Sequence, residues 1–288
     1  MTLPDRYAVI GHPVSHSQSP WIHAEFARQT RQVIDYGRID CPEGAFDVTV
    51  GSFARSGDPT AGVGRACGCN VTIPFKSQAM ALASRVSARA RLAEAANTLR
   101  FDESGWFADN TDGVGLVRDL AINAGITLAD SRILLIGAGG AACGVLGPLI
   151  EARPRTIQVV NRTASKAHDL VARHTALAES HAVELRAGGV AEAGSGYTIV
   201  LNCSASSLTG AAIPVPARVL SPGAWAVDLM YGAAAQPFVD WAQAHGAKGR
   251  DGLGMLVEQA AEAFHLWRGV RPATEPVLAA LRLRLSSS

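Results

Sequence analysis

A glycine-rich loop offers the most specific chemistry in the chain. Residues 137–142 read Gly-Ala-Gly-Gly-Ala-Ala, which has the form G-x-G-x-x-A, and they follow the apolar run at 133–136. The first glycine allows a tight turn, the second lets the backbone approach a pyrophosphate, and the small last residue lets helix and strand pack closely. N–H groups at the start of the next helix would stabilise phosphates. An ordinary strand-to-helix turn is the alternative. The residues predicted to bind a dinucleotide are Gly137, Ala138, Gly139, Gly140, Ala141 and Ala142.

The segment at 161–166 indicates which dinucleotide the loop serves. An acidic residue about 20 positions after the loop would bind the ribose 2′-hydroxyl of NAD, and none is present. Arg162 and Lys166 instead supply two cations, and Asn161 and Thr163 supply small polar groups. A guanidinium binds a 2′-phosphate with two parallel hydrogen bonds, and cations at a helix start are unfavourable unless an anion faces them. The segment therefore predicts NADP.

Serine hydroxyls precede the first predicted helix. Pro20 suits the first position of that helix, which makes Ser19 the expected N-cap. Ser17 and Ser19 could then donate hydrogen bonds to a carboxylate at the helix start. Capping alone would account for Ser19, but it would not account for the hydroxyls before it.

Further polar residues stand where other predicted strands end or helices begin. Thr72 and Lys76 lie in Asn-Val-Thr-Ile-Pro-Phe-Lys at 70–76, Asn97 precedes a strand, and Asp112 lies in Asn-Thr-Asp-Gly at 110–113. Taken singly, Lys76 and Asp112 are more often solvated surface charges than catalytic groups. Gln259 shares a helical face with apolar residues, so it needs a hydrogen-bonding partner.

The elements that must position these residues alternate between strand and helix, which is typical of an α/β protein with mostly parallel sheets. We expect a substrate-binding catalytic domain at 1–112, a Rossmann-type doubly wound NADP domain at 113–252, and carboxyl-terminal helices at 253–288 that return to the first domain. The predicted strands lie at 7–10, 33–39, 68–73, 98–101, 106–108, 133–136, 156–160, 183–186, 198–202 and 225–229, and the predicted helices at 20–30, 46–56, 76–83, 113–125 and 255–268. The polar turn at 102–105 predicts that the strands at 98–101 and 106–108 form a hairpin.

Composition narrows the class of partner. The 288 residues favour two domains, and 26 basic against 25 acidic residues give no basic stripe for nucleic acid. Apolar residues occur in short runs, none near the roughly 20 needed to span a bilayer, and the amino terminus lacks signal-peptide features. Five cysteines fit neither a disulfide framework nor a zinc site. We expect a cytoplasmic protein that binds a small molecule, with no metal, no membrane and no nucleic acid.

Seven motifs in sequence order together resemble the shikimate dehydrogenase family. They are the serine cluster around Ser17 and Ser19, the segment 70–76, Ala-Asn-Thr at 96–98, Asn-Thr-Asp-Gly at 110–113, the loop at 137–142, Asn-Arg-Thr at 161–163 and Gly-Met-Leu-Val-Glu-Gln-Ala at 254–260. The resemblance covers essentially the whole chain. It implies an enzyme of aromatic amino acid biosynthesis that reversibly reduces 3-dehydroshikimate to shikimate with NADPH.

The resemblance also implies a role for each matching residue. Ser17 and Ser19 would bind the substrate carboxylate, and Thr72, Asn97 and Gln259 its hydroxyls. Lys76 and Asp112 would flank the reacting carbonyl as the catalytic pair. Tyr231 would lie near the carboxylate, although a buried structural tyrosine is as good an interpretation of its sequence context. Leu229 and Gly252 would lie against the nicotinamide.

Some features leave alternatives open. His12, Ala233 and Gln236 depart from the residues common in the family, which affects loops rather than the reacting centre. A quinate/shikimate dehydrogenase with relaxed cofactor use is one alternative, and a non-catalytic NADP-binding regulator is another. The sequence is compatible with a monomer or a homodimer.

Overall fold

The computed structural model describes residues 3–204 and 213–286, and these fold into two compact units. Unit 1 comprises Met1–Thr111 and Val257–Ser288, and unit 2 comprises Asp112–Leu256. Each unit has one six-stranded sheet among its described residues. The predicted α/β class with two domains is confirmed. Within the described ranges, no helix is both long and apolar enough to cross a membrane.

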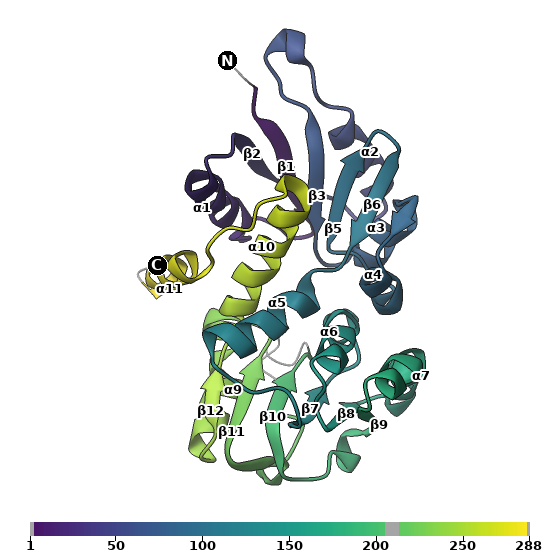
Figure 1. The fold of residues 1–288 in the computed structure, drawn as a ribbon, viewed down its shortest axis with the longest axis vertical. Helices are drawn as coiled ribbons and strands as arrows, with labels where there is room; N and C mark the ends of the chain where they lie inside the picture. The colour runs from purple at the N-terminus through teal and green to yellow at the C-terminus, as the bar shows by residue number, and fades with distance from the viewer. Residues whose placement is uncertain (1–2, 205–212, 287–288) are drawn as a thin grey trace. The chain divides into compact units, whose positions relative to one another are not determined.

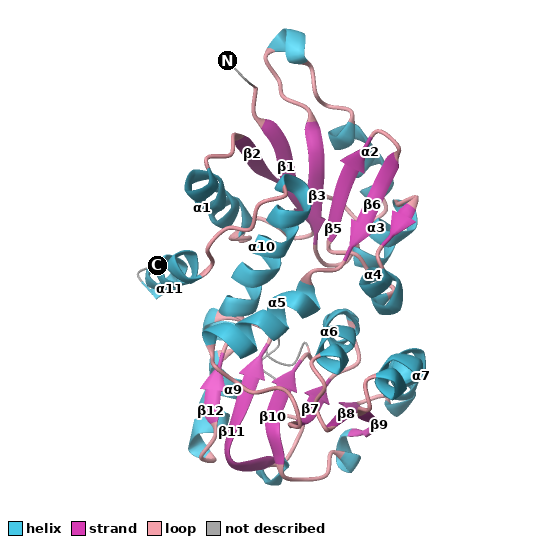
Figure 2. Cartoon of the chain, in the orientation of Figure 1, coloured by secondary structure: helices cyan, strands magenta, loops and turns pink. Residues whose placement is uncertain are grey.

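The sheet of unit 1 is mixed, and its strands run in the order β2-β1-β3-β5-β6-β4. β1 is parallel to β2 and β3, whereas β5 is antiparallel to β3 and β6, which confirms the predicted hairpin. The carboxyl ends of β1, β3 and β6 therefore meet the start of β5 at one edge. The strands are β1 (Asp5–Gly11), β2 (Ile34–Asp40), β3 (Ala66–Val71), β4 (Arg85–Val86), β5 (Thr98–Asp102) and β6 (Gly105–Asp109), drawn as magenta arrows in Figure 2.

Helices cover both faces of this sheet because its central strands are apolar on both sides. Ile10 of β1 belongs to a buried cluster with Phe46 and Phe75, whereas the neighbouring Tyr7 stacks on Trp267 of the carboxyl-terminal helix α10, with ring centroids 4.6 Å apart. At Gly68 a Cβ would lie 2.6 Å from Nε1 of Trp267, so glycine lets α10 approach the sheet. The helices are α1 (Ser19–Thr30), α2 (Phe46–Ala54), α3 (Lys76–Leu82), α4 (Ala88–Ala93), α10 (Leu253–Arg268) and α11 (Glu275–Ser286) (Figure 1).

The sheet of unit 2 is wholly parallel and doubly wound, with the order β12-β11-β10-β7-β8-β9. The chain builds outward from β7 in one direction and from β10 in the other. Such a fold places its ligand crevice at the carboxyl ends of the two strands where the order reverses. The strands are β7 (Arg132–Ile136), β8 (Thr156–Asn161), β9 (Glu184–Gly189), β10 (Tyr197–Asn202), β11 (Leu220–Asp228) and β12 (Lys248–Arg250), and the helices include α5 (Asp112–Arg118), α6 (Gly140–Glu151), α7 (Ala164–Ser180) and α9 (Gln236–Ala244).

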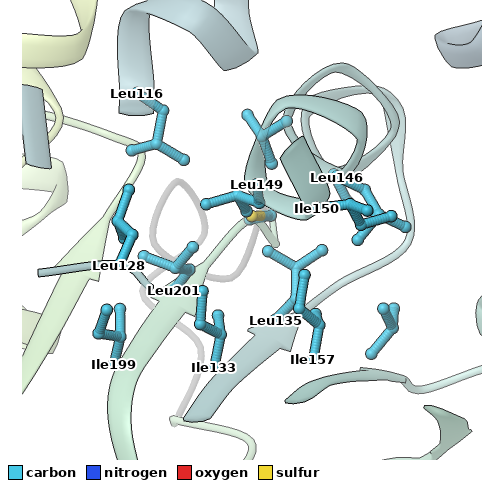
Figure 3. Packing of buried hydrophobic residues seen from close by; sticks show 14 of the residues in the cluster. Leu116, Leu128, Ile133, Leu135, Leu146, Leu149, Ile150, Ile157, Ile199 and Leu201 are labelled. Atoms are coloured by element: carbon cyan, nitrogen blue, oxygen red, sulfur yellow. The ribbon is translucent and has the colours of Figure 1, made fainter. Parts of the chain in front are cut away.

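Aliphatic side chains from β7 and β10 form the core of unit 2. Leu135 and Leu201 point from these strands toward Leu146 and Leu149 of α6 (Figure 3). All four side chains are fully buried. Packing of α6 against β7 fixes the position of the glycine-rich loop that joins them.

The predicted helix at 113–125 is only partly right. α5 ends at Arg118, and a π-helical turn follows over Asp119–Asn123. The carboxylate of Asp119 is fully buried and accepts hydrogen bonds from Arg250 at 2.5 and 2.9 Å and from the Asn123 amide at 3.0 Å. A Cβ at Gly254 would lie 1.8 Å from Asp119 Oδ1. Arg250 thus joins β12 to the π-turn, and glycine is required where α10 begins beside it.

The short elements β4, α4 and β12 were not predicted, because two to six residues are too few to show a period. Their tertiary contacts define them. Ser87, for example, caps α4 with a side chain that accepts the Ala90 N–H at 3.1 Å.

We predict that Arg250→Ala lowers the free energy of unfolding by about 3–5 kcal/mol, because it leaves a buried carboxylate unpaired. Arg28→Ala is the matched control, since Arg28 pairs with Glu25 on the exposed surface of α1, where such pairs contribute about 0–1 kcal/mol. Urea unfolding of both variants measures the difference. Equal losses would contradict a structural role for the buried pair.

Candidate active site

Two loops of unit 1 lie side by side where β1 and β3 end. The His12 N–H donates to the Ile73 carbonyl at 3.0 Å, which joins the serine loop to the segment that carries Thr72 and Lys76. Thr72 is half-buried, and its Cγ2 would lie 2.3 Å from a Cβ at Gly11. Glycine at the end of β1 therefore allows the two loops to approach.

The two serines lie within hydrogen-bonding distance of each other. Ser17 Oγ is 3.2 Å from Ser19 Oγ and accepts the Ser19 N–H at 3.3 Å. The prediction that Ser19 is the N-cap is wrong, because α1 begins at Ser19 and Gln18 is the N-cap without a side-chain bond. Ser17 takes over the role of accepting an N–H at the helix start. Both hydroxyls nevertheless lie at that helix start.

Residues at the end of β2 hold the serine loop, and the sequence reasoning missed them. The Arg38 guanidinium donates to the Ser17 carbonyl at 2.6 and 3.0 Å. Asp40 accepts the Val14 N–H at 3.3 Å and lies 3.1 Å from Nδ1 of His12. Because β2 is parallel to β1, its charged carboxyl end lies beside this loop. The sequence does show two charged residues at the end of the strand predicted at 33–39, and this was the sign by which they could have been found.

Asn97, Thr111 and Gln259 form a hydrogen-bonded group in unit 1. Asn97 Oδ1 accepts the Thr111 N–H at 2.9 Å, and its Nδ2 donates to Thr111 Oγ1 at 2.9 Å and to Gln259 Oε1 at 3.3 Å. Asn97 and Thr111 are buried. The partner that Gln259 was expected to need is thus the Asn97 amide, although 162 positions separate them in the sequence.

A chain of buried, hydrogen-bonded polar groups connects Tyr36 to the backbone of Asn97. Tyr36 Oη donates to Asn70 Oδ1 at 2.7 Å, and Asn70 Nδ2 donates to the Asn97 carbonyl at 3.3 Å and to Thr98 Oγ1 at 3.1 Å. The ring of His23 stacks on Tyr36 with centroids 4.3 Å apart. Burial raises the pKa of Tyr36 well above its usual value, so the phenol stays a hydrogen-bond donor.

Lys76 and Asp112 both stand at the first position of a helix. Lys76 begins α3 and is half-buried, and its carbonyl accepts the Ala96 N–H at 2.8 Å. Asp112 begins α5, follows Thr111 directly and is 7% exposed. Lys76 belongs to unit 1 and Asp112 to unit 2. Their action as a pair stays a prediction.

The glycine-rich loop makes a tight turn after β7 and leaves the start of α6 open. Gly137 has a φ of 107°, and a Cβ there would lie 3.1 Å from the backbone of Cys203, where β10 has just ended. The loop therefore lies at the reversal point of the sheet. Gly139 is the N-cap of α6, and a Cβ at Gly139 or Gly140 would meet open space. The helix start is thus open on the side where an anion would bind.

The predicted 2′-phosphate segment lies beside this loop. The Ala138 N–H donates to Asn161 Oδ1 at 3.3 Å, and Asn161 Nδ2 donates to the Thr163 carbonyl at 2.9 Å. Arg162 and Lys166 are exposed at the start of α7, and within the described part of the chain neither is held by a hydrogen bond or ion pair. Both side chains can therefore reorient toward a phosphate.

Leu229, Tyr231 and Gly252 lie in a second loop region of unit 2. The Gly252 N–H donates to the Met230 carbonyl at 2.8 Å, and a Cβ at Gly252 would lie 2.2 Å from the Leu229 carbonyl oxygen. The protein's own backbone therefore requires this glycine, and its approach to a nicotinamide stays a prediction. Burial raises the pKa of Tyr231, which remains partly exposed.

Three segments match family descriptions. Residues 9–99 match "Shikimate dehydrogenase substrate binding domain", residues 119–206 match "Shikimate / quinate 5-dehydrogenase", and residues 252–282 match "Shikimate 5'-dehydrogenase C-terminal domain". A shikimate dehydrogenase (NADP(+)) from Methylibium petroleiphilum is 60% identical over 96% of this chain and 94% of the relative. The chain belongs to the shikimate dehydrogenase family.

Further relatives and solved structures are similar to this chain in sequence and in fold. The shikimate dehydrogenase (NADP(+)) of Acidovorax ebreus is 54% identical over 98% of both chains. A Thermus thermophilus shikimate 5-dehydrogenase, solved in complex with NADP(H) and shikimate, is 31% identical, with a TM-score of 0.80 over 98% of this chain and 99% of that one. The Ael1 enzyme from Pseudomonas putida is 43% identical, with a TM-score of 0.86 over 96% of this chain and 98% of that one.

We predict that the buried His23 makes this shikimate dehydrogenase family member acid-sensitive. Burial lowers the pKa of His23 to about 3, and the nearby Asn70 amide offsets only part of that shift. In the unfolded chain the group has a pKa near 6.5, so below that pH the unfolded state binds a proton that the folded state excludes. Above about pH 6.5 the buried His23 therefore causes no loss in the free energy of unfolding. As the pH falls from about 6.5 toward about 3, this free energy decreases.

The measurement compares urea unfolding of the wild type and His23→Phe at pH 8 and pH 5. The histidine should cost about 2 kcal/mol of stability at pH 5, a loss that the phenylalanine variant lacks. Phenylalanine keeps the aromatic stack, and taking the difference cancels the other titrating groups, including the buried His174. The same pH dependence in both proteins would refute the assignment.

Proposed function

We propose that this chain catalyses the reversible, NADPH-dependent reduction of 3-dehydroshikimate to shikimate, with unit 1 as the substrate domain and unit 2 as the NADP domain. The main support for the proposal is that the serine loop, the segment from Thr72 to Lys76, Asn97, and the pair Asn110 and Thr111 lie at one edge of the sheet of unit 1. These groups offer hydroxyl, amide and charged partners. They match a small hydroxylated carboxylate.

Hydrogen-bond donors orient the proposed substrate. Ser17 and Ser19 would donate to its carboxylate, assisted by the start of α1. Thr72, Asn97 and Gln259 would bind its hydroxyls. The orientation of the Asn97 amide supports this role, because the Thr111 N–H can only donate and must therefore face the amide oxygen. The Asn97 amine then faces Thr111 Oγ1 and Gln259. Tyr231 would approach the carboxylate.

Lys76 and Asp112 would carry out the proton transfer. When bound, NADPH would supply a hydride to the substrate carbonyl carbon. The oxygen of that carbonyl then gains negative charge, which the Lys76 ammonium stabilises and neutralises by donating a proton. Asp112 would orient the Lys76 side chain. In the oxidation direction the proton passes from the substrate hydroxyl back to the Lys76 amine.

The residues of unit 2 fit NADP on the geometry described above. The backbone of residues 137–142 would hold the pyrophosphate, and Asn161, Arg162, Thr163 and Lys166 would bind the 2′-phosphate. Leu229 and Gly252 would line the nicotinamide end. A guanidinium and an ammonium without partners in the described structure attract a phosphate dianion, whereas NAD offers them only a hydroxyl.

We predict that Lys76→Ala lowers kcat for shikimate oxidation by at least about a hundredfold with a smaller change in KM, as expected of a contact made in the transition state. Lys248→Ala is the control, because it removes an exposed lysine from β12. Steady-state assays of both variants test the role. An unchanged kcat in Lys76→Ala would refute it.

We predict that Arg162→Ala lowers kcat/KM for NADP by about 10- to 100-fold, which corresponds to losing charged hydrogen bonds of about 1.5–3 kcal/mol. The value for NAD should change little, because NAD has no 2′-phosphate. Arg218→Ala, which removes an exposed arginine elsewhere in unit 2, should leave both values unchanged. Equal losses with both cofactors would show that Arg162 does not recognise the phosphate.

A further inference from the structure

A polar cavity lies at the edge of the sheet of unit 2 where its strands begin. It has a volume of about 280 Å³ and is lined where strands β7, β8, β9 and β10 begin. The glycine-rich loop follows the carboxyl end of β7, about 16 Å away along a five-residue strand. The cavity is therefore separate from the cofactor loop. Its lining residues are Arg132, Arg155, Thr156, Gln158, Glu184, Arg186 and Tyr197.

The charge of the cavity is positive. Three arginines face one glutamate, which leaves two positive charges in excess. Arg186 Nε donates to Glu184 Oε1 at 2.9 Å. The Arg155 guanidinium has no hydrogen bond or ion pair with any residue in the described ranges. An anion would therefore find a cation that nothing in the described structure neutralises.

The remaining arginine is fixed in position. Arg132 donates to the carbonyls of Gly196 and Ser195 at 2.9 and 3.2 Å. Its guanidinium lies 5.3 Å from the ring centroid of Tyr197. Backbone carbonyls and a cation–π contact thus preorganise this side of the cavity, so little side-chain entropy would be lost when an anion binds.

Besides the excess positive charge, Gln158 also indicates that the cavity binds a ligand. It lies in the middle of β8 between Leu134 and Arg186, its side chain lines the cavity, and it is 8% exposed. Its amide makes no hydrogen bond within the described structure. Its amide opens into the cavity, because its atoms are not among the fully enclosed polar atoms that lack a partner. A valine or leucine would serve a central strand better, unless the amide binds something that enters the cavity.

We propose that this cavity binds the phosphate group of a small phosphate monoester. A dianion matches the two excess positive charges, guanidinium groups bind phosphate oxygens with paired hydrogen bonds, and the Gln158 amide donates one more. A volume of about 280 Å³ is at or below the lower end of ordinary ligand pockets, which excludes a second dinucleotide.

The test is isothermal titration calorimetry with inorganic phosphate and with glycerol 3-phosphate at constant ionic strength. Saturating NADP is present throughout, so that the cofactor site is filled and cannot bind the probe. The double variant Arg155→Gln/Arg186→Gln removes two exposed charges of the cavity, and Arg173→Gln removes an exposed charge from α7 as the control. Glycerol is the neutral control ligand.

We expect one site for each phosphate probe, a dissociation constant at least about tenfold higher in the double variant, and no change in Arg173→Gln. Gln158→Leu should weaken binding at least about fivefold while leaving the unliganded protein folded, since leucine suits a central strand beside Leu134. The proposal is overturned if neither probe binds, or if the double variant or Gln158→Leu binds as tightly as the wild type.

Discussion

The hydrogen bonds of Asn97 are the constraint on which the candidate substrate site depends. Its carbonyl accepts the Val71 N–H at 2.7 Å at the end of β3, and its N–H donates to the Asp109 carbonyl at 3.0 Å at the end of β6. Its side chain reaches Thr111 and Gln259. One residue thus fixes the spacing of two strand ends and of α10. Loops that carry the other polar groups continue from those strand ends.

A buried amide can hold this position only if its own partners are satisfied. Tyr36 and Asn70 complete the network on the inner side, and the apolar rings around His23 keep water out of it. Hydrogen bonds in such surroundings are strong, and an unpaired group there is costly. The network therefore allows few alternative arrangements. The rigid part of unit 1 is the part that faces the proposed substrate.

Local patterns predicted much of this arrangement. The loop at 137–142, the strands around it and the hairpin at 98–108 each depend on neighbours within a few residues, so glycine positions and apolar runs were sufficient. The shared sheet edge was also foreseeable, because the motifs follow predicted strands. The N-cap at Ser19 was predicted incorrectly. Gln18 is the N-cap and Ser17 accepts the Ser19 N–H, and only the backbone geometry shows which of these neighbouring residues has which role.

Long-range contacts could not be predicted from the same patterns. Arg38 and Asp40 look like ordinary strand-end charges, and nothing local shows that they hold the serine loop. The bond between Asn97 and Gln259 joins residues 162 positions apart. The helix predicted to run to residue 125 gives way to a π-turn at Asp119, whose buried carboxylate pairs with Arg250, 131 positions away. Such contacts depend on the tertiary fold, which a single sequence does not encode in any short window.

The most direct test of the central claim is the rate at which the purified protein reduces NADP when shikimate is added, followed by the absorbance of NADPH. We predict a saturable rate that requires both shikimate and NADP and that falls sharply when NAD replaces NADP. A protein that binds NADP but gives no NADPH with shikimate would contradict the account.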